Sequence, residues 1–326
     1  MIPLRRRLLA AGLSLPFAPL LGCTRPEPLI RVAGIVWIGY EPLFLARELG
    51  YFDDSRLRLV ETPSNTASLT ALASGDVEAA TLTLDECLIA REGGLDVRAI
   101  LVFDDSAGAD VIMAQPDIRD LGDLRGKRIG VEATAAGALM LSKLLEAARL
   151  RPEEVRKVPL IAANHVAAYQ AREVDALVSF EPFATQLAGV GARRLLDSRR
   201  FPGLIVDVLA ARGEALERAP EQFAHLTRGY FRALDHLQRG GGDAAARMAP
   251  RMGITPAEVT EALNGVRMMD RAANHAWLGG EPPLLVGTAD MVAEVMQREA
   301  LLRTRPNLER LADPRFLPAG ANGETV

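Results

Sequence analysis

Short apolar runs and amphipathic segments alternate along the chain from residue 30 onward. Runs such as LIRVAGIVW, RLRLVE and VEAATLT predict strands, and the segment after each has helical spacing of its apolar residues. Gly50 and Gly75 stand where two of these helices should end. Strands that alternate with helices of about ten residues predict βα units and mostly parallel sheets. The fold class expected from the pattern is therefore α/β.

The alternation changes character after the apolar run ADVIMA, where a polar stretch begins at Gln115-Pro116. We interpret this stretch as a crossing between two lobes, and the apolar strand near residue 208, which has no short helix after it, as the crossing back. A first lobe is expected from residues 24–115 and 208–326, and a second lobe from residues 116–207. Most of the remaining chain has helical spacing and forms a helical tail.

The first 23 residues have the plan of an export signal. Three arginines at residues 5–7 precede an uncharged run over 8–22, which is short for a membrane span, and then Cys23. The sequence LLGC at 20–23 resembles the lipobox of bacterial lipoproteins. We therefore expect a signal peptide over residues 1–23 and a lipid on Cys23 that anchors the exported protein to the membrane. A soluble signal with a chance cysteine, and general or twin-arginine export, stay open.

Composition narrows the classes of partner. A net charge of −4 and a pI near 5.7 argue against nucleic acid, whose phosphates require a basic surface. The chain has two cysteines, so a lipid on Cys23 would leave no intramolecular disulfide, and Cys87 is expected to be a buried residue on a helix. Aromatic residues are few, so the closely spaced pair Trp37 and Tyr40 is a stronger candidate for a ligand-binding role than it would be in an aromatic-rich chain.

Several stretches resemble, in order, the substrate-binding proteins of ABC importers in the nitrate, taurine and thiamine-precursor group. The stretches are WIGYEPLFLARELGYF, ALASGDVEAATLT, SAGADVIMA, DLRGKRIGV and EVDALVSFEPFATQL, and together they cover roughly residues 30–210. The resemblance implies a type II periplasmic-binding-protein fold, with two crossover strands between lobes that close on a ligand. It also implies a periplasmic monomer that delivers a small molecule to ABC permease and ATPase subunits.

Two other functions remain open under the same resemblance. One is a ligand sensor that reports to a membrane receptor, and the other is an enzyme of the same fold, such as a pyrimidine-forming protein. The sequence has no Cys/His metal spacing, no G-x-S-x-G motif and no phosphate loop, and its four histidines are scattered. We therefore expect a binding protein with no catalytic residue, no metal and no cofactor.

The candidate ligand contacts lie in the turns between the end of a strand and the start of the next helix. Ligands of open parallel sheets bind at the carboxyl ends of the strands and in clefts between lobes. The candidates are Trp37, Tyr40, Glu41, Ser64, Asn65, Thr66, Thr83, Asp85, Asp105, Ser106, Glu132, Thr134, Asn164 and Glu181. Trp37 and Tyr40 can form an aromatic wall that attracts a cation, with core packing as the alternative. Ser64, Asn65 and Thr66 also suit simple helix capping.

Carboxylates dominate these turns. Glu41 and Glu181 each precede a proline at a helix start, Glu132 stands in the loop where oxyanion-binding relatives hold their anion, and Asp207 lies near another turn. No lysine or arginine falls in the same turns, and His165 is the one histidine there. An anionic ligand would meet uncompensated carboxylates, so a neutral or amine-bearing ligand is favoured over an oxyanion. Acidic residues also stabilise helix starts by themselves, which is the alternative explanation.

Overall fold

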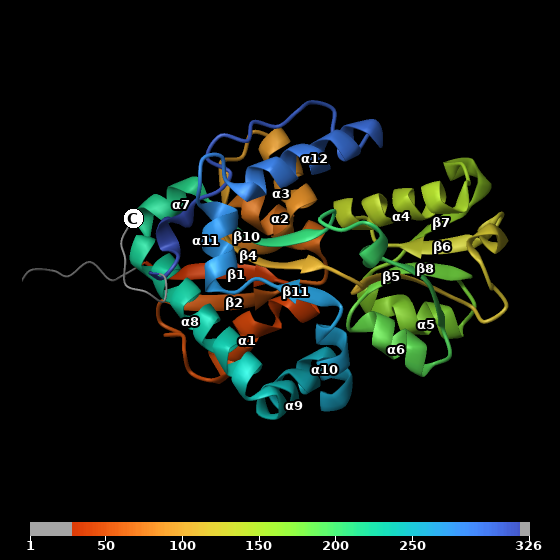
Figure 1. Cartoon of the computed structure of the whole chain (residues 1–326), viewed down its shortest axis with the longest axis horizontal. Coiled ribbons are helices and arrows are strands. Elements are labelled where there is room, and N and C mark those ends of the chain that lie inside the picture. The colour runs from red at the N-terminus through yellow and green to blue at the C-terminus, as the bar shows by residue number, and fades with distance from the viewer. Residues whose placement is uncertain (1–27, 320–326) are drawn as a thin grey trace, which may run out of the picture.

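The computed structural model describes residues 28–319 of the chain as two lobes, a larger one with a six-stranded sheet and a smaller one with a five-stranded sheet (Figure 1). Both sheets are flanked by helices, which confirms the predicted α/β class. The signal peptide and the lipid site predicted at Cys23 lie outside the described residues. Within the part described, no helix is long and apolar enough to cross a membrane.

In the sheet of the first lobe, four of the six strands run in the same direction. Its strands, in spatial order, are β11 (Val266–Met268), β4 (Val97–Ser106), β10 (Val206–Arg212), β3 (Ala79–Thr83), β1 (Ile30–Gly34) and β2 (Leu57–Glu61). β1 runs parallel to β2 and β3, whereas β10 runs antiparallel to both β3 and β4. The sheet is apolar on both faces, as expected when helices cover both of them.

Two groups of helices cover these faces (Figure 1). One core joins the sheet to α1 (Glu41–Glu48), α8 (Pro220–Arg239) and α9 (Gly241–Met252), next to which lies α10 (Pro256–Leu263). The other core joins it to α2 (Asn65–Ser74), α3 (Leu84–Glu92), α11 (Arg271–Leu278) and α12 (Leu284–Arg298). α7 (Gly213–Arg218) lies between β10 and α8. Most of the helices that follow β10 therefore pack on the first lobe, where the resemblance placed the helical tail.

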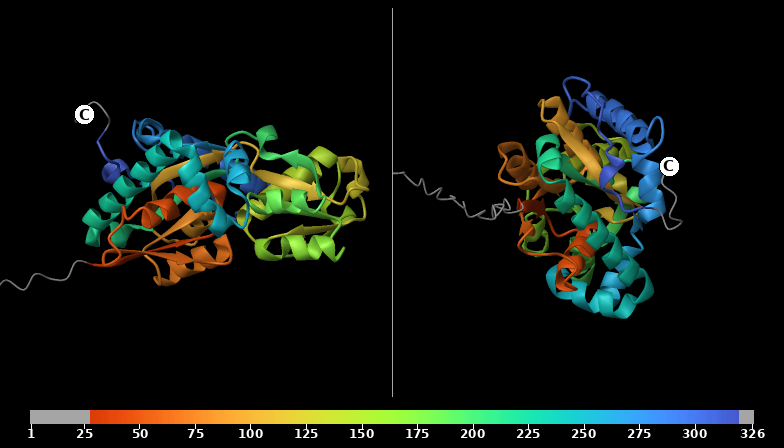
Figure 2. Two further views of the ribbon diagram at one scale, coloured as in Figure 1. Left: turned by 90° about the horizontal axis from the view of Figure 1, so that it is seen from below. Right: turned by 90° about the vertical axis from the view of Figure 1, so that its left-hand side faces the viewer.

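The second lobe is a smaller version of the same layering. Its strands, in spatial order, are β7 (Arg156–Pro159), β6 (Arg128–Val131), β8 (Ala176–Phe180), β5 (Asp110–Ala114) and β9 (Arg193–Asp197). α4 (Ala135–Ala148) covers one face, and α5 (His165–Gln170) and α6 (Phe183–Gly189) cover the other (Figures 1 and 2).

The lobe boundaries differ from those expected from the sequence. β5 pairs with β8 and β9, so the run predicted to be the last strand of the first lobe belongs to the second. The chain crosses at residues 107–109, where Gly108 has a φ of 126° that favours glycine, and returns through residues 198–205. Gln115-Pro116, expected to be the crossing, follows the far end of β5. The polar character of a turn was mistaken there for that of a linker.

β5 and β10, the strands that enter each lobe from the other, run against most of their neighbours. β4 and β9 end at the cleft, so β5 and β10 begin there, and each brings an aspartate to its edge: Asp110 is the first residue of β5 and Asp207 the second of β10. This antiparallel entry places carboxyl groups in the cleft from strand starts, in addition to those from strand ends.

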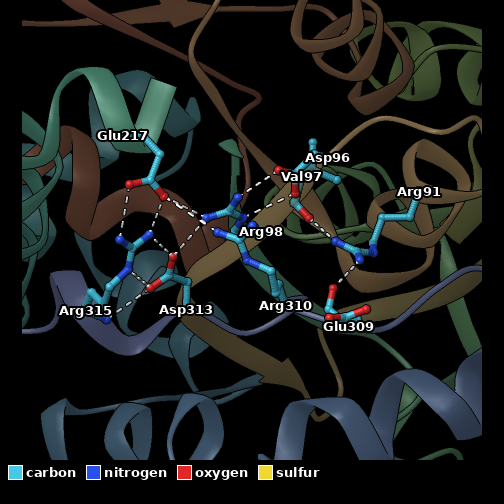
Figure 3. Close-up of polar contacts among 9 residues, drawn as sticks. All are labelled: Arg91, Asp96, Val97, Arg98, Glu217, Glu309, Arg310, Asp313 and Arg315. Carbon is cyan, nitrogen blue, oxygen red and sulfur yellow. Dashed lines mark hydrogen bonds and ion pairs between the residues drawn. The ribbon is translucent and has the colours of Figure 1, made fainter. Parts of the chain in front are cut away.

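The chain after α12 is fastened to the start of β4, at the end of the lobe away from the cleft. The backbone N–H of Ala99 donates to the carbonyl of Leu311 at 2.7 Å. Figure 3 shows the ion-pair network beside this contact, in which the buried Arg98 bonds to Asp96 and Glu217 while Arg315 bonds to Glu217 and Asp313. The helical tail is therefore held by contacts that are remote from the ligand cleft.

Candidate functional site

A cavity of about 40 Å³ lies between the lobes. The first lobe contributes Ile35, Trp37, Tyr40, Asn65, Thr83 and Asp207 to its lining. The second lobe contributes chiefly Asp110, Glu132, Thr134, Val178 and Phe180. The volume suffices for a few water molecules, so a ligand must be slender or the lobes must open further to admit it.

The first turn provides an aromatic wall that continues across the lobe boundary. The Trp37 ring packs edge-to-face on Phe180 of the second lobe, with ring centroids 5.8 Å apart, and its Nε1–H donates to Asp104 at 3.3 Å. Gly39 makes this turn possible, because a Cβ there would lie 1.8 Å from the Asp104 carboxylate. The predicted wall therefore exists, and its polar atoms are directed at carboxyl groups.

Asp104 and Asp207 form a buried acidic pair behind this wall. They are neighbours in the register of β4 and β10, and the Tyr40 hydroxyl donates to Asp207. Burial raises the pKa of both carboxyl groups, and the charge of Asp104 raises the pKa of Asp207 further. The pair therefore resists carrying two negative charges at neutral pH.

The second lobe faces this pair with further carboxyl groups. Burial raises the pKa of Asp110 to about 7 and the pKa of Glu132 to about 7. Asp110 feels the charge of Asp85, and Asp110 in turn raises the pKa of Asp104. Acidic groups from both lobes thus crowd one cleft, and each makes the ionisation of its neighbours harder.

Several buried oxygens at the cavity have no hydrogen-bond partner among the described residues. They are Oδ2 of Asp110, Oδ2 of Asp207, Oδ1 of Asn65 and Oγ1 of Thr83. Buried polar atoms in native proteins are nearly always paired, because an unpaired one costs about 1–3 kcal/mol. These atoms are therefore suited to contact a polar ligand.

The structure brings six of the predicted contacts to the cavity: Trp37, Tyr40, Asn65, Thr83, Glu132 and Thr134. Thr134 also caps α4, since its hydroxyl accepts from the backbone N–H of Gly137. Whether these residues contact the ligand stays a prediction, and their position at the cavity supports it.

Three of the carboxylates predicted to contact the ligand form ion pairs with arginines. Glu41 pairs with Arg251 of α9, Glu181 with Arg194 at 3.3 Å, and Asp105 with Arg267 at 3.0 Å. The carboxylate of Glu181 also accepts from the backbone N–H of Thr185. None of the three carboxylates lines the cavity described above, whereas Glu181 lines a second cavity, between α6 and α10. The ion pairs give Glu41 and Glu181 a structural role, and contact of either residue with the ligand stays a prediction.

The remaining five predicted contacts also lie off the cavity. Ser64 caps α2, and the hydroxyl of Ser106 bonds to Ser198 at 2.8 Å beside the crossings. Asp85 is buried in the first turn of α3, and Asn164 is exposed at the start of α5. The fifth, Thr66, joins the lobes, because its hydroxyl donates to the carbonyl of Ala133 at 2.8 Å.

Asp110, Asp207 and Phe180 are the site residues that sequence reasoning did not select. Asp207 had been placed near a cleft turn without being assigned to the site, whereas Asp104 lies in the same loop as Asp105 and Ser106, where the family resemblance places binding residues. Asp110 opens a strand, and the search covered strand ends, so an acidic residue directly after a glycine-containing crossing was the signal available for it.

The residues that line the cavity are of few kinds. Among described residues, those that line the cavity include no serine, cysteine or histidine. No group of three or more His, Cys, Asp or Glu in residues 28–319 is placed to hold a metal ion. What the cavity offers is an apolar and aromatic wall with unpaired carboxyl oxygens at its edges.

Comparisons with solved structures show a shared fold. The alkanesulfonate-binding protein SsuA from Xanthomonas axonopodis pv. citri, bound to MOPS, matches with a TM-score of 0.71 and 20% identity, over 86% of this chain and 96% of that one. The ligand-binding component of an ABC-type import system from Staphylococcus aureus, with zinc bound, matches with a TM-score of 0.74 and 15% identity, over 89% and 98%. The desulfurization enzyme DSZB also has this fold, with a TM-score of 0.63 and 18% identity over 88% and 97%.

Curated relatives match over shorter stretches. A protein described as a binding protein, from Brucella abortus (strain 2308), is 25% identical over 178 residues, which is 53% of this chain and 54% of that protein. A protein described as aliphatic-sulfonate-binding, from Escherichia coli (strain K12), is 26% identical over 147 residues, 44% of this chain and 46% of that protein. The match thus spans about half the length of these relatives or less.

A family comparison covers more of the chain. The sequence model of the NMT1-like family matches residues 24–252, which is well over half of the 326 residues. The matched region contains both sheets except β11, and it contains every residue that lines the cavity. The chain therefore belongs to the NMT1-like family.

Proposed function

We propose that this protein is the extracytoplasmic solute-binding component of an ABC importer. It captures a small organic molecule between its lobes and delivers the molecule to a permease and its ATPase. The observation that carries the proposal is the cavity at the lobe boundary, which joins unpaired buried oxygens to an aromatic wall from both lobes. Small-molecule sites commonly combine a mostly apolar lining with a few convergent polar groups.

The ligand class we propose is a small organic molecule with an amino group. Three carboxyl groups, those of Asp110, Glu132 and Asp207, line the cavity, and no arginine, lysine or histidine does among the described residues. An oxyanion would bring a further negative charge into a buried acidic site, whereas an ammonium group would compensate the charge already there. The resemblance in fold to alkanesulfonate-binding proteins therefore does not extend to their ligand.

Membrane attachment belongs to the same proposal. A lipid on Cys23 would hold a monomer at the outer face of the cytoplasmic membrane or beyond it. In the sequence, residues 24–29 lie between Cys23 and the start of β1.

A thermal-shift panel tests the ligand class. The purified protein is heated with amines and amino-substituted heterocycles in one set, and with taurine, alkanesulfonates, nitrate and phosphonates in the other. A ligand at 100 times its Kd adds about 2.7 kcal/mol of stability, which raises Tm by several degrees. We expect shifts with amines. Shifts with oxyanions alone would contradict the proposed ligand class and would make the acidic lining structural.

A further inference from the structure

The cleft carboxyl groups occupy two separate places in the second lobe. Asp110 opens β5, where it pairs in register with Phe180 at the end of β8, and Glu132 directly follows β6 on the other side of β8. Adjacent strands lie about 4.8 Å apart, so the two acidic residues are separated by about 10 Å across the edge of the sheet. Both residues line the cavity and both are buried.

The first lobe has an unpaired acceptor opposite each of these places. Asp207, whose pKa is raised by burial, by the charge of Asp104 and to a smaller degree by that of Asp110, has an unpaired Oδ2 and lines the cavity. Asn65 presents a free Oδ1, and it is adjacent to Thr66, whose hydroxyl bonds to Ala133 next to Glu132. One end of the cavity is thus bounded by two aspartates, and the other by a glutamate and an amide oxygen.

Much of the remaining lining is apolar. Trp37, Phe180, Val178 and Ile35 line the cavity together with the hydroxyl-bearing Tyr40 and Thr83, and the volume of about 40 Å³ leaves little room for a broad ligand. Nothing among the described lining residues carries a positive charge that could neutralise either end. A cation at each end would allow these buried carboxyl groups to ionise, and in the closed cleft the ligand would have to supply it.

Resting on the function proposed above, we infer that the ligand is a slender aliphatic molecule with two protonated amino groups. One amino group binds between Asp110 and Asp207, and the other binds between Glu132 and Asn65. The chain between the amino groups packs against Trp37 and Phe180. Each amino group then contacts both lobes, so the full set of contacts exists only in the closed form, and this is what links binding to closure.

Titration calorimetry with defined probes tests this inference. The probes are 1,4-diaminobutane, its homologues with three to six carbons, and 1-aminobutane, which has the same chain and one amino group. The second amino group adds a charge-assisted hydrogen bond, so the best diamine should bind at least about tenfold more tightly than 1-aminobutane. Equal affinities, or no binding of any diamine, would overturn the inference.

Two variants assign the ends of the site. Glu132→Gln should reduce diamine affinity to that of 1-aminobutane and leave the monoamine nearly unaffected, whereas Asp110→Asn should weaken both. Glu146→Gln, an exposed position on α4 of the same lobe, is the matched control and should change neither. Melting curves without ligand confirm that the variants fold. A Glu132→Gln protein that keeps the full diamine advantage would contradict the two-ended site.

The outcomes also separate this inference from the proposed function. If monoamines or amino-heterocycles bind and diamines have no advantage, the two-ended site is wrong and the amine-binding function stands. If only oxyanions bind, the two-ended site and the proposed amine ligand class are both wrong, and the solute-binding function stands.

Discussion

Tyr40 and Tyr230 are buried phenols with opposite surroundings, which makes them a natural pair for comparison. Tyr40 donates its hydroxyl to Asp207 at the cavity, whereas the hydroxyl of Tyr230 has no hydrogen-bond partner among the described residues. Both rings pack edge-to-face on Phe103, with centroids 5.1 Å and 5.2 Å from it. The two side chains therefore differ in hydrogen bonding far more than in packing.

We predict that Tyr40→Phe lowers the free energy of unfolding by about 1–3 kcal/mol, because the substitution leaves the buried Asp207 without its donor. Tyr230→Phe should change stability little or raise it, since its hydroxyl is desolvated without a hydrogen bond in return. Urea unfolding followed by circular dichroism measures both. Equal losses in the two variants would show that ring packing, and not the bond to Asp207, accounts for the effect.

At the scale of elements, α2 and α6 connect the lobes on either side of the cleft. Thr66 of α2 bonds to the carbonyl of Ala133 in the second lobe, and Gln186 of α6 donates to the carbonyl of Met252 in the first lobe at 2.9 Å. Each is a single neutral hydrogen bond, worth about 1 kcal/mol. Together they are well placed to bias the equilibrium between the open and closed forms.

We predict that the double variant Thr66→Ala/Gln186→Ala opens more readily than the parent protein. Its radius of gyration without ligand, measured by small-angle X-ray scattering, should be larger, because two bonds that exist only in the closed form are lost. Thr70→Ala is the control, since Thr70 lies on the same helix and bonds within it to the carbonyl of Thr66 at 2.8 Å. A double variant indistinguishable from Thr70→Ala would rule out a role of these bonds in closure.

The order of strands and helices could be predicted from the sequence, because each element leaves a local pattern. Gly75, predicted to end a helix, is one such case, because the structure has it as the C-cap of α2. The lobe to which a strand belongs leaves no such local pattern. The apolar sequence of β5 would suit either sheet, and its pairing with β8 and β9 assigns it to the second lobe. The predicted crossing was therefore misplaced by one strand.

The same limit applies to the site. Residues that follow parallel strands, such as Trp37 and Glu132, were identified because strand ends are visible in the sequence. The ion pair of Glu41 could not be identified in the same way, because its partner Arg251 lies 210 positions away in the chain. Asp110 and Asp207 were missed because each lies at the start of its strand. That β5 and β10 run antiparallel to their neighbours, and so start at the cleft, depends on the whole fold and leaves no local pattern in the sequence.

At the scale of the whole molecule, the buried acidic cleft makes stability depend on pH. Asp110 and Glu132 have pKa values raised to about 7, and the pKa values of Asp104 and Asp207 are raised as well. Between pH 5 and 8 the folded state therefore binds more protons than the unfolded state, whose carboxyl groups are already ionised. Stability falls as pH rises through this window. His165 acts in the opposite direction, because burial lowers its pKa to about 4.

We predict that the Tm of the unliganded protein is lower at pH 8 than at pH 5.5, by on the order of 5 °C. Among the described residues, nine carboxyl groups have raised pKa values and two histidines, His165 and His225, have lowered ones, so the carboxyl groups fix the sign. Differential scanning calorimetry at the two pH values gives the difference, and Asp110→Asn should reduce it, whereas Asp54→Asn at an exposed position should not. A higher Tm at pH 8 in the parent protein would show that the cleft carboxyl groups ionise without penalty.

The contact between Trp37 and Phe180 has a practical consequence. Trp37 belongs to the first lobe and Phe180 to the second, and the chain has one other tryptophan, Trp277, on α11 away from the cavity. When the lobes separate, the indole loses its aromatic neighbour and gains water, while the surroundings of Trp277 stay as they are. The intrinsic tryptophan fluorescence of a Trp277→Phe protein would then come from Trp37 at the lobe boundary. Opening and closing of the lobes could therefore be followed by fluorescence without an attached dye.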